Sequence, residues 1–307
     1  MTSTVTGSVT AEQATTAGPL GERGRAALFS RRPLEGVRVV DAHAHAGPYS
    51  RFFIPDHDVP GMVGVMDRCG VSVAFVSTHL ALELDVVRGN ALTAELVDRA
   101  AGRFRGLVVV NPHHDPEATL ARWIDDPRFV GVKLHPDLHE YPATGTRYEP
   151  VWRAAEKLGF PVLVHSWAGS AFDDLRHFAT LAERHPAATV VLGHSGARRP
   201  HFEEAAELAA RHPGLVLELC GSFMTSYWVR RLVEIVGPDR VLFGSDFPFI
   251  DLRYSLGRTL FADLADDDLA KVLGDSASRL VRRFRPDDPA FAPPLAPRPD
   301  HQERRTP

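Results

Sequence analysis

Short apolar stretches recur along the chain, and segments of helical character separate them. The stretches are rich in Val, Leu, Ile or Phe on both faces, which is typical of buried parallel strands. We therefore predict eight strands, at Val37–Asp41, Val71–Ser77, Leu107–Val110, Phe129–Leu134, Phe160–Val164, Thr189–Leu192, Leu215–Leu219 and Arg240–Phe243. The segments that we expect to be helical are Asn90–Ala101, Glu117–Ile124, Tyr148–Leu158, Ala171–Arg184, Pro200–Arg211 and Tyr227–Val236.

This alternation of strands and helices favours an α/β fold, the closed (β/α)8 or TIM barrel. A doubly wound open sheet has the same alternation and is the alternative fold. No Gly-x-Gly-x-x-Gly follows the first predicted strand, which counts against the dinucleotide-binding form of the open sheet.

The predicted barrel occupies residues 36–285, close to the length of about 250 residues that such a barrel usually has. Residues 1–35 are rich in Thr, Ala, Gly and Arg, and we predict a flexible N-terminal tail there. Residues 286–307 mix proline with charges and predict a C-terminal tail. We see no apolar stretch of the kind found in signal peptides or transmembrane helices.

The composition is that of a soluble globular protein, with 44% hydrophobic and 24% charged residues. A formal net charge of -4 gives no reason to expect nucleic acid or a membrane surface as a partner. The two cysteines, Cys69 and Cys220, are too few for a disulfide framework. Reduced thiols in a cytoplasmic protein are the simplest interpretation.

Polar residues that can bind metals stand at the ends of several predicted strands. The first strand leads into His43 and His45, whose side chains project to one face of an extended chain because they are two residues apart. The other strand-end residues of this kind are Lys133, His165, His194 and Asp246. A barrel enzyme has its chemistry at these strand ends, and burying such groups without partners is costly. We therefore predict that they meet around a metal ion.

These segments together resemble the amidohydrolase superfamily, and within it the amidohydrolase-related branch that includes aminocarboxymuconate-semialdehyde decarboxylase-like enzymes. The resemblance covers about the whole of residues 36–285. Its motifs are Asp41-Ala-His43-Ala-His45, Gly131-Val-Lys133-Leu-His135-Pro136, His165, Gly193-His194-Ser195-Gly196 and Gly244-Ser-Asp246-Phe-Pro248. No single motif would identify the family, but their order and spacing along the barrel together are specific for it.

The resemblance implies one divalent metal ion, most often zinc in this branch, and four ligands. Those ligands would be His43, His45, His165 and Asp246, a set of three imidazoles and a carboxylate that suits zinc. Iron or manganese could occupy similar ligands. The resemblance also implies catalytic roles for Asp246, as a proton acceptor, and for His194, as an acid–base or hydrogen-bonding group. In other branches of the superfamily the equivalent of His194 binds a second metal, so its role stays open.

Lys133 has two interpretations. In two-metal members of the superfamily a lysine on this strand is carboxylated and bridges the ions. The alternative, which we prefer, is one metal and a cationic Lys133 that binds a substrate carboxylate. His135 has the same strand parity and is a further candidate, although it precedes a proline and could simply end the strand.

Residues after the strands are expected to contact the substrate. Trp167 follows His165 closely enough to wall the pocket, and Arg51 and Arg253 lie in the first and last such loops. Either arginine could meet a substrate carboxylate, although arginines that face solvent are commoner.

The leading functional prediction is a metal-dependent hydrolase that acts on a small organic acid, amide or lactone through a metal-activated water. The alternative is a metal-dependent decarboxylase of an unsaturated or aromatic carboxylic acid, since both reactions can use the same residues. A catalytically silent ligand-binding barrel is a third hypothesis, and it predicts a protein without stoichiometric metal. The expected partner is a small-molecule substrate, with homo-oligomerisation left open.

Overall fold

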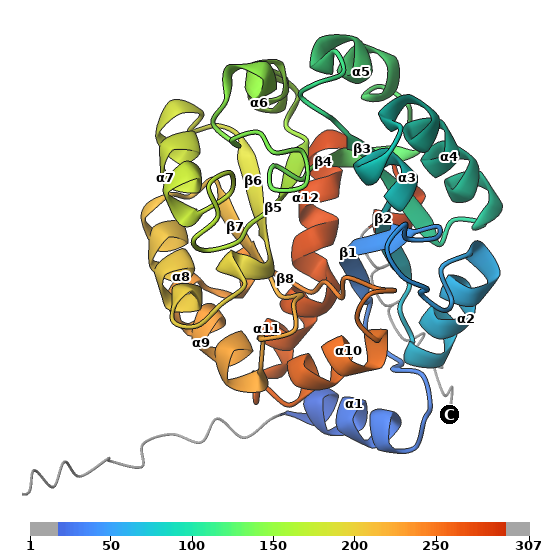
Figure 1. Cartoon of the computed structure of the whole chain (residues 1–307). Helices are drawn as coiled ribbons and strands as arrows, with labels where there is room; N and C mark the ends of the chain where they lie inside the picture. Colours follow the sequence, from blue (N-terminus) through green and yellow to red (C-terminus); the bar gives the residue numbers. More distant parts are fainter. Residues whose placement is uncertain (1–17, 293–307) are drawn as a thin grey trace, which may run out of the picture.

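The strands of the computed structural model, which describes residues 18–292, form one parallel sheet in the order of the sequence (Figure 1). They are β1 (Val40–Ala46), β2 (Val73–Thr78), β3 (Phe104–Val109), β4 (Phe129–Leu134), β5 (Pro161–His165), β6 (Thr189–Gly193), β7 (Leu215–Glu218) and β8 (Val241–Leu242). All eight predicted strands are confirmed in position. The largest difference is at β1, which begins later than predicted and runs through His43 and His45.

The sheet closes because the segment after β8 bonds back to β1. The backbone nitrogen of Ala42 donates to the Phe243 carbonyl over 3.0 Å, and that of Asp246 donates to the His43 carbonyl over 2.8 Å. A parallel bridge between Ala44 and Phe247 extends this contact. These bonds confirm the predicted (β/α)8 barrel over the open sheet.

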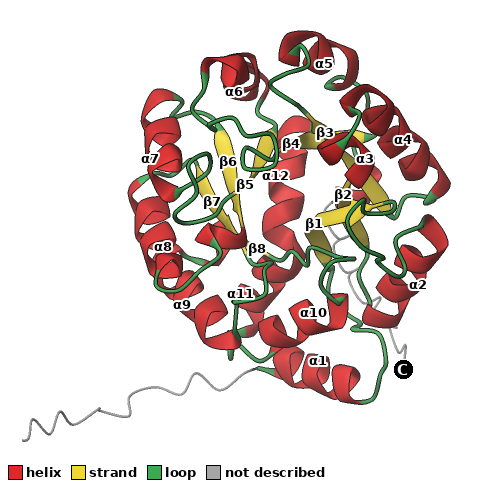
Figure 2. Cartoon of the chain, viewed as in Figure 1, coloured by secondary structure: helices red, strands yellow, loops and turns green. Residues whose placement is uncertain are grey.

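Helices surround the barrel (Figure 2). Those that follow the strands are α2 (Val59–Cys69), α3 (His79–Glu83), α4 (Val86–Arg99), α5 (Pro116–Trp123), α6 (Glu149–Leu158), α7 (Leu175–Arg184), α8 (His201–Arg211), α9 (Ser226–Val236) and α10 (Leu252–Leu260). Further helical segments are α1 (Pro19–Phe29), α11 (Asp266–Ala270), the π-helical turn η4 (Lys271–Asp275) and α12 (Ser276–Phe284), and the short 3-10 turns are η1 (Thr146–Tyr148), η2 (His194–Gly196), η3 (Pro238–Arg240) and η5 (Pro289–Phe291). The six predicted helices are all present.

The interior of the barrel is a separate apolar core that α12 closes from below. Val40, Phe75 and Leu107 belong to this core, together with Leu280 of α12 and the fully buried Phe291 of η5. In Figure 1, α12 is seen through the ring of strands. The opposite end of the barrel, where the strands have their C-terminal ends, is therefore the end available for a site.

Parts of both predicted tails pack on the barrel. Helix α1 begins at Pro19 and buries Leu20, and Gly24 lies where an added Cβ would be 2.5 Å from Leu260 of α10. At the other end, Asp288 forms an ion pair with Arg105 of β3. Both segments have apolar residues to bury, which is the physical reason for the difference from the predicted tails. Residues 1–17 and 293–307, the rest of those tails, lie outside the described residues.

None of the helices within residues 18–292 has the length and apolar composition that a bilayer-spanning helix requires.

Candidate metal centre and active site

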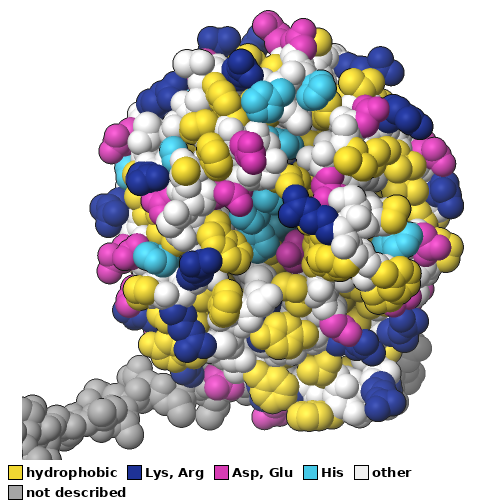
Figure 3. Space-filling view, in the orientation of Figure 1, with side chains coloured by type: hydrophobic (Ala, Val, Ile, Leu, Met, Phe, Trp, Pro, Cys, Tyr) yellow, Lys and Arg dark blue, Asp and Glu magenta, His cyan; other side chains and the backbone are white. Residues whose placement is uncertain are grey.

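A cavity of about 210 Å³ lies at the C-terminal ends of the strands. In the space-filling view, histidine side chains are visible in the hollow near the middle of this face (Figure 3). The residues that line the cavity are His43, His45, Tyr49, His79, Leu82, Glu83, Lys133, His135, Leu138, His165, Trp167, His194, Asp246 and Phe249. The strand-end residues singled out from the sequence therefore meet in one cavity.

The two histidines of β1 each have one ring nitrogen held from behind. His43 Nδ1 lies 2.9 Å from Glu218 Oε2, and His45 Nδ1 lies 3.0 Å from Ser77 Oγ. The other nitrogens face Asp246, whose Oδ1 is 3.2 Å from His45 Nε2 and 3.7 Å from His43 Nε2. Ligand atoms that each lie about 2.1 Å from one ion are about 3.0–3.5 Å apart. The distance from Asp246 to His45 lies within this range and the distance to His43 slightly above it, so Asp246 is placed to share an ion with a β1 histidine.

The protonation of these rings also suits a metal. Burial, and then the Lys133 charge, hold the pKa of His43 well below its ordinary value. Burial likewise lowers the pKa of His45, against the opposing effect of Asp246. Both rings are therefore neutral at pH 7, and neutral imidazole is the form that ligates metals.

His165 enters the cavity from the end of β5, and its ring is fixed by its neighbours. Its Nδ1 lies 2.6 Å from Asp173 Oδ2, a fully buried carboxylate. Its ring stacks on His135 at 4.0 Å between centroids and is 4.8 Å from the ring of His194. Ligand-type atoms of His135, His165 and Asp173 all lie within 4.8 Å of one another. The bond to Asp173 leaves Nε2 of His165 available, in the manner of metal-binding histidines with a second carboxylate partner.

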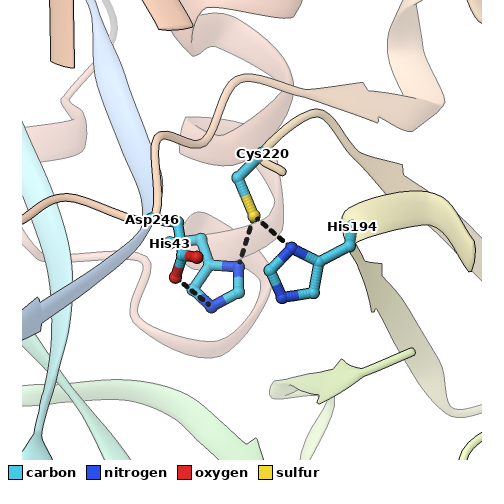
Figure 4. Close-up of side chains that lie close together, drawn as sticks. All are labelled: His43, His194, Cys220 and Asp246. Carbon is cyan, nitrogen blue, oxygen red and sulfur yellow. Dashed lines mark hydrogen bonds and ion pairs between the residues drawn. The ribbon is translucent and has the colours of Figure 1, made fainter. Parts of the chain in front are cut away.

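Glu218 and Cys220, which we did not predict as site residues, hold two of the histidines. Figure 4 shows the thiol of Cys220 beside the rings of His43 and His194. Glu218 Oε2 accepts hydrogen bonds from the His194 backbone nitrogen, at 3.1 Å, and from Cys220 Sγ, at 2.8 Å. Cys220 Sγ in turn lies 3.1 Å from Nδ1 of both His43 and His194. His43, His194, Cys220 and Asp246 form a group whose ligand-type atoms lie within 4.8 Å of one another. Cys220 is on the Nδ1 side of His43 and Asp246 on the Nε2 side, so the thiol supports the ring from behind.

The sequence contains a signal for this pair. Glu218 and Cys220 are two residues apart at the end of a predicted strand, so their side chains share one face. Sequence reasoning treated Cys220 as an ordinary reduced thiol. The structure confirms that both Cys69 and Cys220 are free and buried.

Lys133 of β4 is buried at the floor of the cavity, with 1% of its surface exposed. Its Nζ lies 2.8 Å from His43 Nε2. Burial lowers the pKa of Lys133, and Asp246 opposes this effect most strongly. Because a ring nitrogen has one lone pair, His43 Nε2 either accepts a hydrogen bond from Lys133 or ligates an ion.

The segment that carries Asp246 is tied directly to β1. Asp41 accepts hydrogen bonds from the backbone nitrogens of Ser245, at 2.9 Å, and His43, at 3.2 Å. Burial raises the pKa of Asp41 to about 7, and the bonds from Ser245 and His43 oppose that rise. Asp246 itself has a φ of 62°, and His194 has a φ of 66°. Left-handed backbone at non-glycine residues is uncommon and concentrates at functional sites.

The predicted substrate-binding residues have different positions. Trp167 lines the cavity, and its ring is parallel to that of His165 at 6.0 Å. Arg51 and Arg253 are exposed and are not among the lining residues. The guanidinium of Arg253 is held by Asp251 at the start of α10, beside a separate hollow of about 540 Å³ that Arg68 and Cys69 also line. The structure thus brings Lys133 and Trp167 to the site, but neither arginine.

The fold and this cluster define a metal-dependent barrel enzyme. The chain belongs to the amidohydrolase family, whose model matches residues 40–283. It is similar to gamma-resorcylate decarboxylase from Rhizobium radiobacter, with 26% identity over 251 residues that cover 64% of this chain and 75% of the relative. The predicted family is confirmed, as is the predicted class of enzyme, a hydrolase or carboxy-lyase.

Two solved structures have the same fold. That of 5-carboxyvanillate decarboxylase from Sphingomonas paucimobilis has a TM-score of 0.65 and 17% identity, and the match covers 80% of this chain and 99% of that one. The dihydroxybenzoic acid decarboxylase of Polaromonas sp. JS666, solved with manganese and the inhibitor 2-nitroresorcinol, has a TM-score of 0.63 and 18% identity, with 80% and 97% covered.

Proposed function

We propose that this protein is a metal-dependent decarboxylase of a small aromatic or unsaturated carboxylic acid. The observation that carries the proposal is the position of Lys133. It is the only lysine or arginine among the residues that line the cavity. It is buried beside the histidine cluster, where a bound carboxylate would supply the opposite charge that a buried cation needs. A cationic Lys133 that binds substrate is our proposal, in preference to a carboxylated one.

The walls of the cavity favour a small planar acid. Tyr49, Trp167 and Phe249 are aromatic lining residues, and flat rings pack well against one another. At about 210 Å³ the cavity is smaller than the roughly 300–1,000 Å³ of typical sites for drug-sized ligands. The relatives also support an aromatic acid as the substrate, because those described above are named as decarboxylases of aromatic acids. They favour our alternative prediction over the leading hydrolase prediction.

We propose His43, His45, His165 and Asp246 as ligands of one divalent ion. When bound, the ion would supply positive charge that stabilises an anionic substrate. Three imidazoles and a carboxylate suit zinc, while the Polaromonas structure contains manganese, so both metals belong in the test. Zinc as the native metal and a cytoplasmic location stay predictions.

In decarboxylation, Lys133, Trp167 and His194 each have a separate role. Lys133 pairs with the carboxylate and orients it, and Trp167 covers the ring and limits access of water. His194, held by Cys220 at Nδ1 over 3.1 Å, takes up a proton from solvent and passes one to the carbon that bears the carboxylate, so that its ring is neutral before and after the step. The bond to the carboxylate carbon then breaks, its electron pair returns to the ring or alkene, and CO₂ leaves.

The proposal is tested by loading the purified protein with Mn²⁺ or Zn²⁺ and incubating it with a panel of hydroxybenzoates and unsaturated acids. The expected result is one CO₂ released per substrate consumed, dependent on the metal. Hydrolysis of lactones or amides without CO₂ release from any acid would contradict the proposal and favour the hydrolase. A protein that binds no stoichiometric metal would favour the silent barrel.

A further inference from the structure

His79 begins α3 directly after β2 and forms part of the cavity wall. Its side chain is buried, with 1% of its surface exposed. Nδ1 lies 2.8 Å from the carbonyl oxygen of Gly47, in the loop that follows β1. Because a carbonyl oxygen can only accept, Nδ1 carries the proton of this bond. The bond therefore fixes both the orientation of the ring and its tautomer.

The second nitrogen of the ring, Nε2, is buried and has no hydrogen-bond partner among the described residues. A neutral imidazole carries a proton on only one ring nitrogen, and the bond to the Gly47 carbonyl places it on Nδ1. With the proton on Nδ1, Nε2 presents a lone pair and can only accept. Buried acceptors are almost always paired in folded proteins, so an unpaired one in a cavity wall indicates a donor on the ligand.

The neighbours of His79 place this acceptor where a substrate ring would bind. The ring of His79 is 4.8 Å from Phe249 and 5.4 Å from Tyr49, and both of these residues line the cavity. It is also 5.4 Å from the ring of His45, the proposed metal ligand. A ligand whose carboxylate is held by the metal and Lys133 would thus bring its ring toward His79.

We propose that His79 is a specificity residue, whose Nε2 accepts a hydrogen bond from a hydroxyl group on the substrate. This inference rests on the proposed function and identifies its substrate as a hydroxylated acid. The bond also assists the reaction, since drawing the hydroxyl proton toward nitrogen raises the electron density of the ring. Protonation of the carbon that loses CO₂ then becomes easier, and the hydroxyl proton stays shared between oxygen and nitrogen.

The test uses three matched pairs of acids, namely 2-, 3- and 4-hydroxybenzoate and the corresponding fluorobenzoates. Fluorine replaces the hydroxyl at similar size but cannot donate. Equilibrium binding to the Mn²⁺-loaded protein is measured by titration calorimetry for the wild type, His79→Leu and His79→Gln. Leu removes the acceptor, whereas Gln keeps an acceptor oxygen near the position of Nε2. His57→Leu is the matched control, because Nδ1 of His57 is also buried without a partner but His57 does not line the cavity.

We expect the wild type to bind at least one hydroxybenzoate about 10-fold more tightly than its fluoro counterpart, the effect of one well-made hydrogen bond. His79→Leu should lose this preference, while His79→Gln and His57→Leu should keep it.

Equal binding of all the pairs by the wild type, or an unchanged preference in folded, metal-loaded His79→Leu, would overturn the inference and leave the proposed function intact. If His79→Leu fails to fold, His79→Phe takes its place, since it keeps a buried ring without an acceptor, and an unchanged preference in that variant overturns the inference. Failure of every acid to bind would overturn the proposed function, and the inference with it.

Discussion

At the scale of single residues, the site depends on which nitrogen of each histidine is already engaged. Glu218 and Cys220 hold His43 at Nδ1, Ser77 holds His45, and Asp173 holds His165. The carboxylates of Glu218 and Asp173 accept, so they place the ring proton on Nδ1 and the lone pair on Nε2. Loss of such a partner usually costs about 10–100-fold in metal affinity. The supporting residues are therefore as much part of the proposed metal centre as the proposed ligands.

Glu218→Gln tests this support. The substituted amide would still fill the space of the Glu218 side chain, but it would lack the charge that stabilises the N–H of His43. We expect metal affinity to fall by about 10–100-fold, measured by competition with a chelating dye, while the circular dichroism spectrum stays that of the folded barrel.

Glu83→Gln is the control, because Glu83 lines the same cavity but bonds Ser50 rather than a histidine. It should bind metal like the wild type. An unchanged affinity in Glu218→Gln would show that Glu218 does not tune the ligand set.

His194 separates a one-metal from a two-metal site. If it transfers a proton and does not bind metal, His194→Ala should keep near-stoichiometric metal and lose about 10²–10⁴ in kcat. Metal analysis and steady-state kinetics on the same preparation provide both values. Loss of half the metal in His194→Ala, and equally in Lys133→Ala, would instead indicate two ions bridged by a carboxylated lysine.

At the scale of elements, the position of His79 depends on a close contact between two helices. Gly89 of α4 lies against α3 so closely that an added Cβ would be 2.2 Å from the backbone of Ala81. Gly89→Ala must therefore displace α3, and we expect a loss of about 1–3 kcal/mol in the free energy of unfolding together with a raised KM. Urea denaturation and kinetics measure the two effects.

Gly64→Ala in α2 is the matched control, since the nearest atom to its added Cβ is the end of the flexible Arg68 side chain at 3.5 Å. That change should be neutral or stabilise the protein by up to about 1 kcal/mol, because alanine is the better helix former. Equal effects of the two substitutions would count against a special contact at Gly89.

His139 in the loop after β4 links two further elements and makes stability depend on pH. It bonds the Leu82 carbonyl and the Tyr148 hydroxyl, and burial lowers its pKa from 6.5 to about 4. Between pH 4 and pH 6.5, the unfolded chain therefore carries a proton on His139 that the folded chain does not. Stability from this group is fully present above pH 6.5 and is lost as the pH falls toward 4.

We expect the wild type to lose about 2–3 kcal/mol more than His139→Gln between pH 7 and 4.5, at 1.36 kcal/mol per tenfold change in proton affinity. Urea unfolding of both proteins at the two pH values measures the difference. Equal losses would show that His139 is protonated without cost in the folded state.

The elements were predictable from the sequence where their local signals were strong. Strand β4 has the predicted bounds because the apolar run Phe129–Leu134 ends at a His-Pro pair. Helix α2 was not predicted, since Pro60, Gly61 and Gly64 weaken its helical signal. What forms it is tertiary burial of Met62 and Met66, together with the Asp58 cap on Gly61, and no local pattern reveals that burial.

At the scale of the whole molecule, barrel closure brings distant strand ends together. The sequence therefore predicted which strand-end residues would share a cavity, because the topology places every such end on one face. It did not predict the contacts that run between non-adjacent strands. Glu218 of β7 contacts His43 of β1, and Lys133 of β4 contacts the same ring. Both contacts depend on the width of the barrel and on the length of the side chains.

The central claim, that the enzyme decarboxylates an acid by protonating the carbon that loses CO₂, is tested most directly by isotope labelling. The metal-loaded protein is incubated in D₂O with its best acid, labelled with ¹³C in the carboxylate, and gas and product are analysed by mass spectrometry. We predict one ¹³CO₂ per turnover and a product with one deuterium at the vacated carbon. A product that retains the ¹³C-carboxylate, or one that gains oxygen from water at a cleaved bond, would contradict decarboxylation.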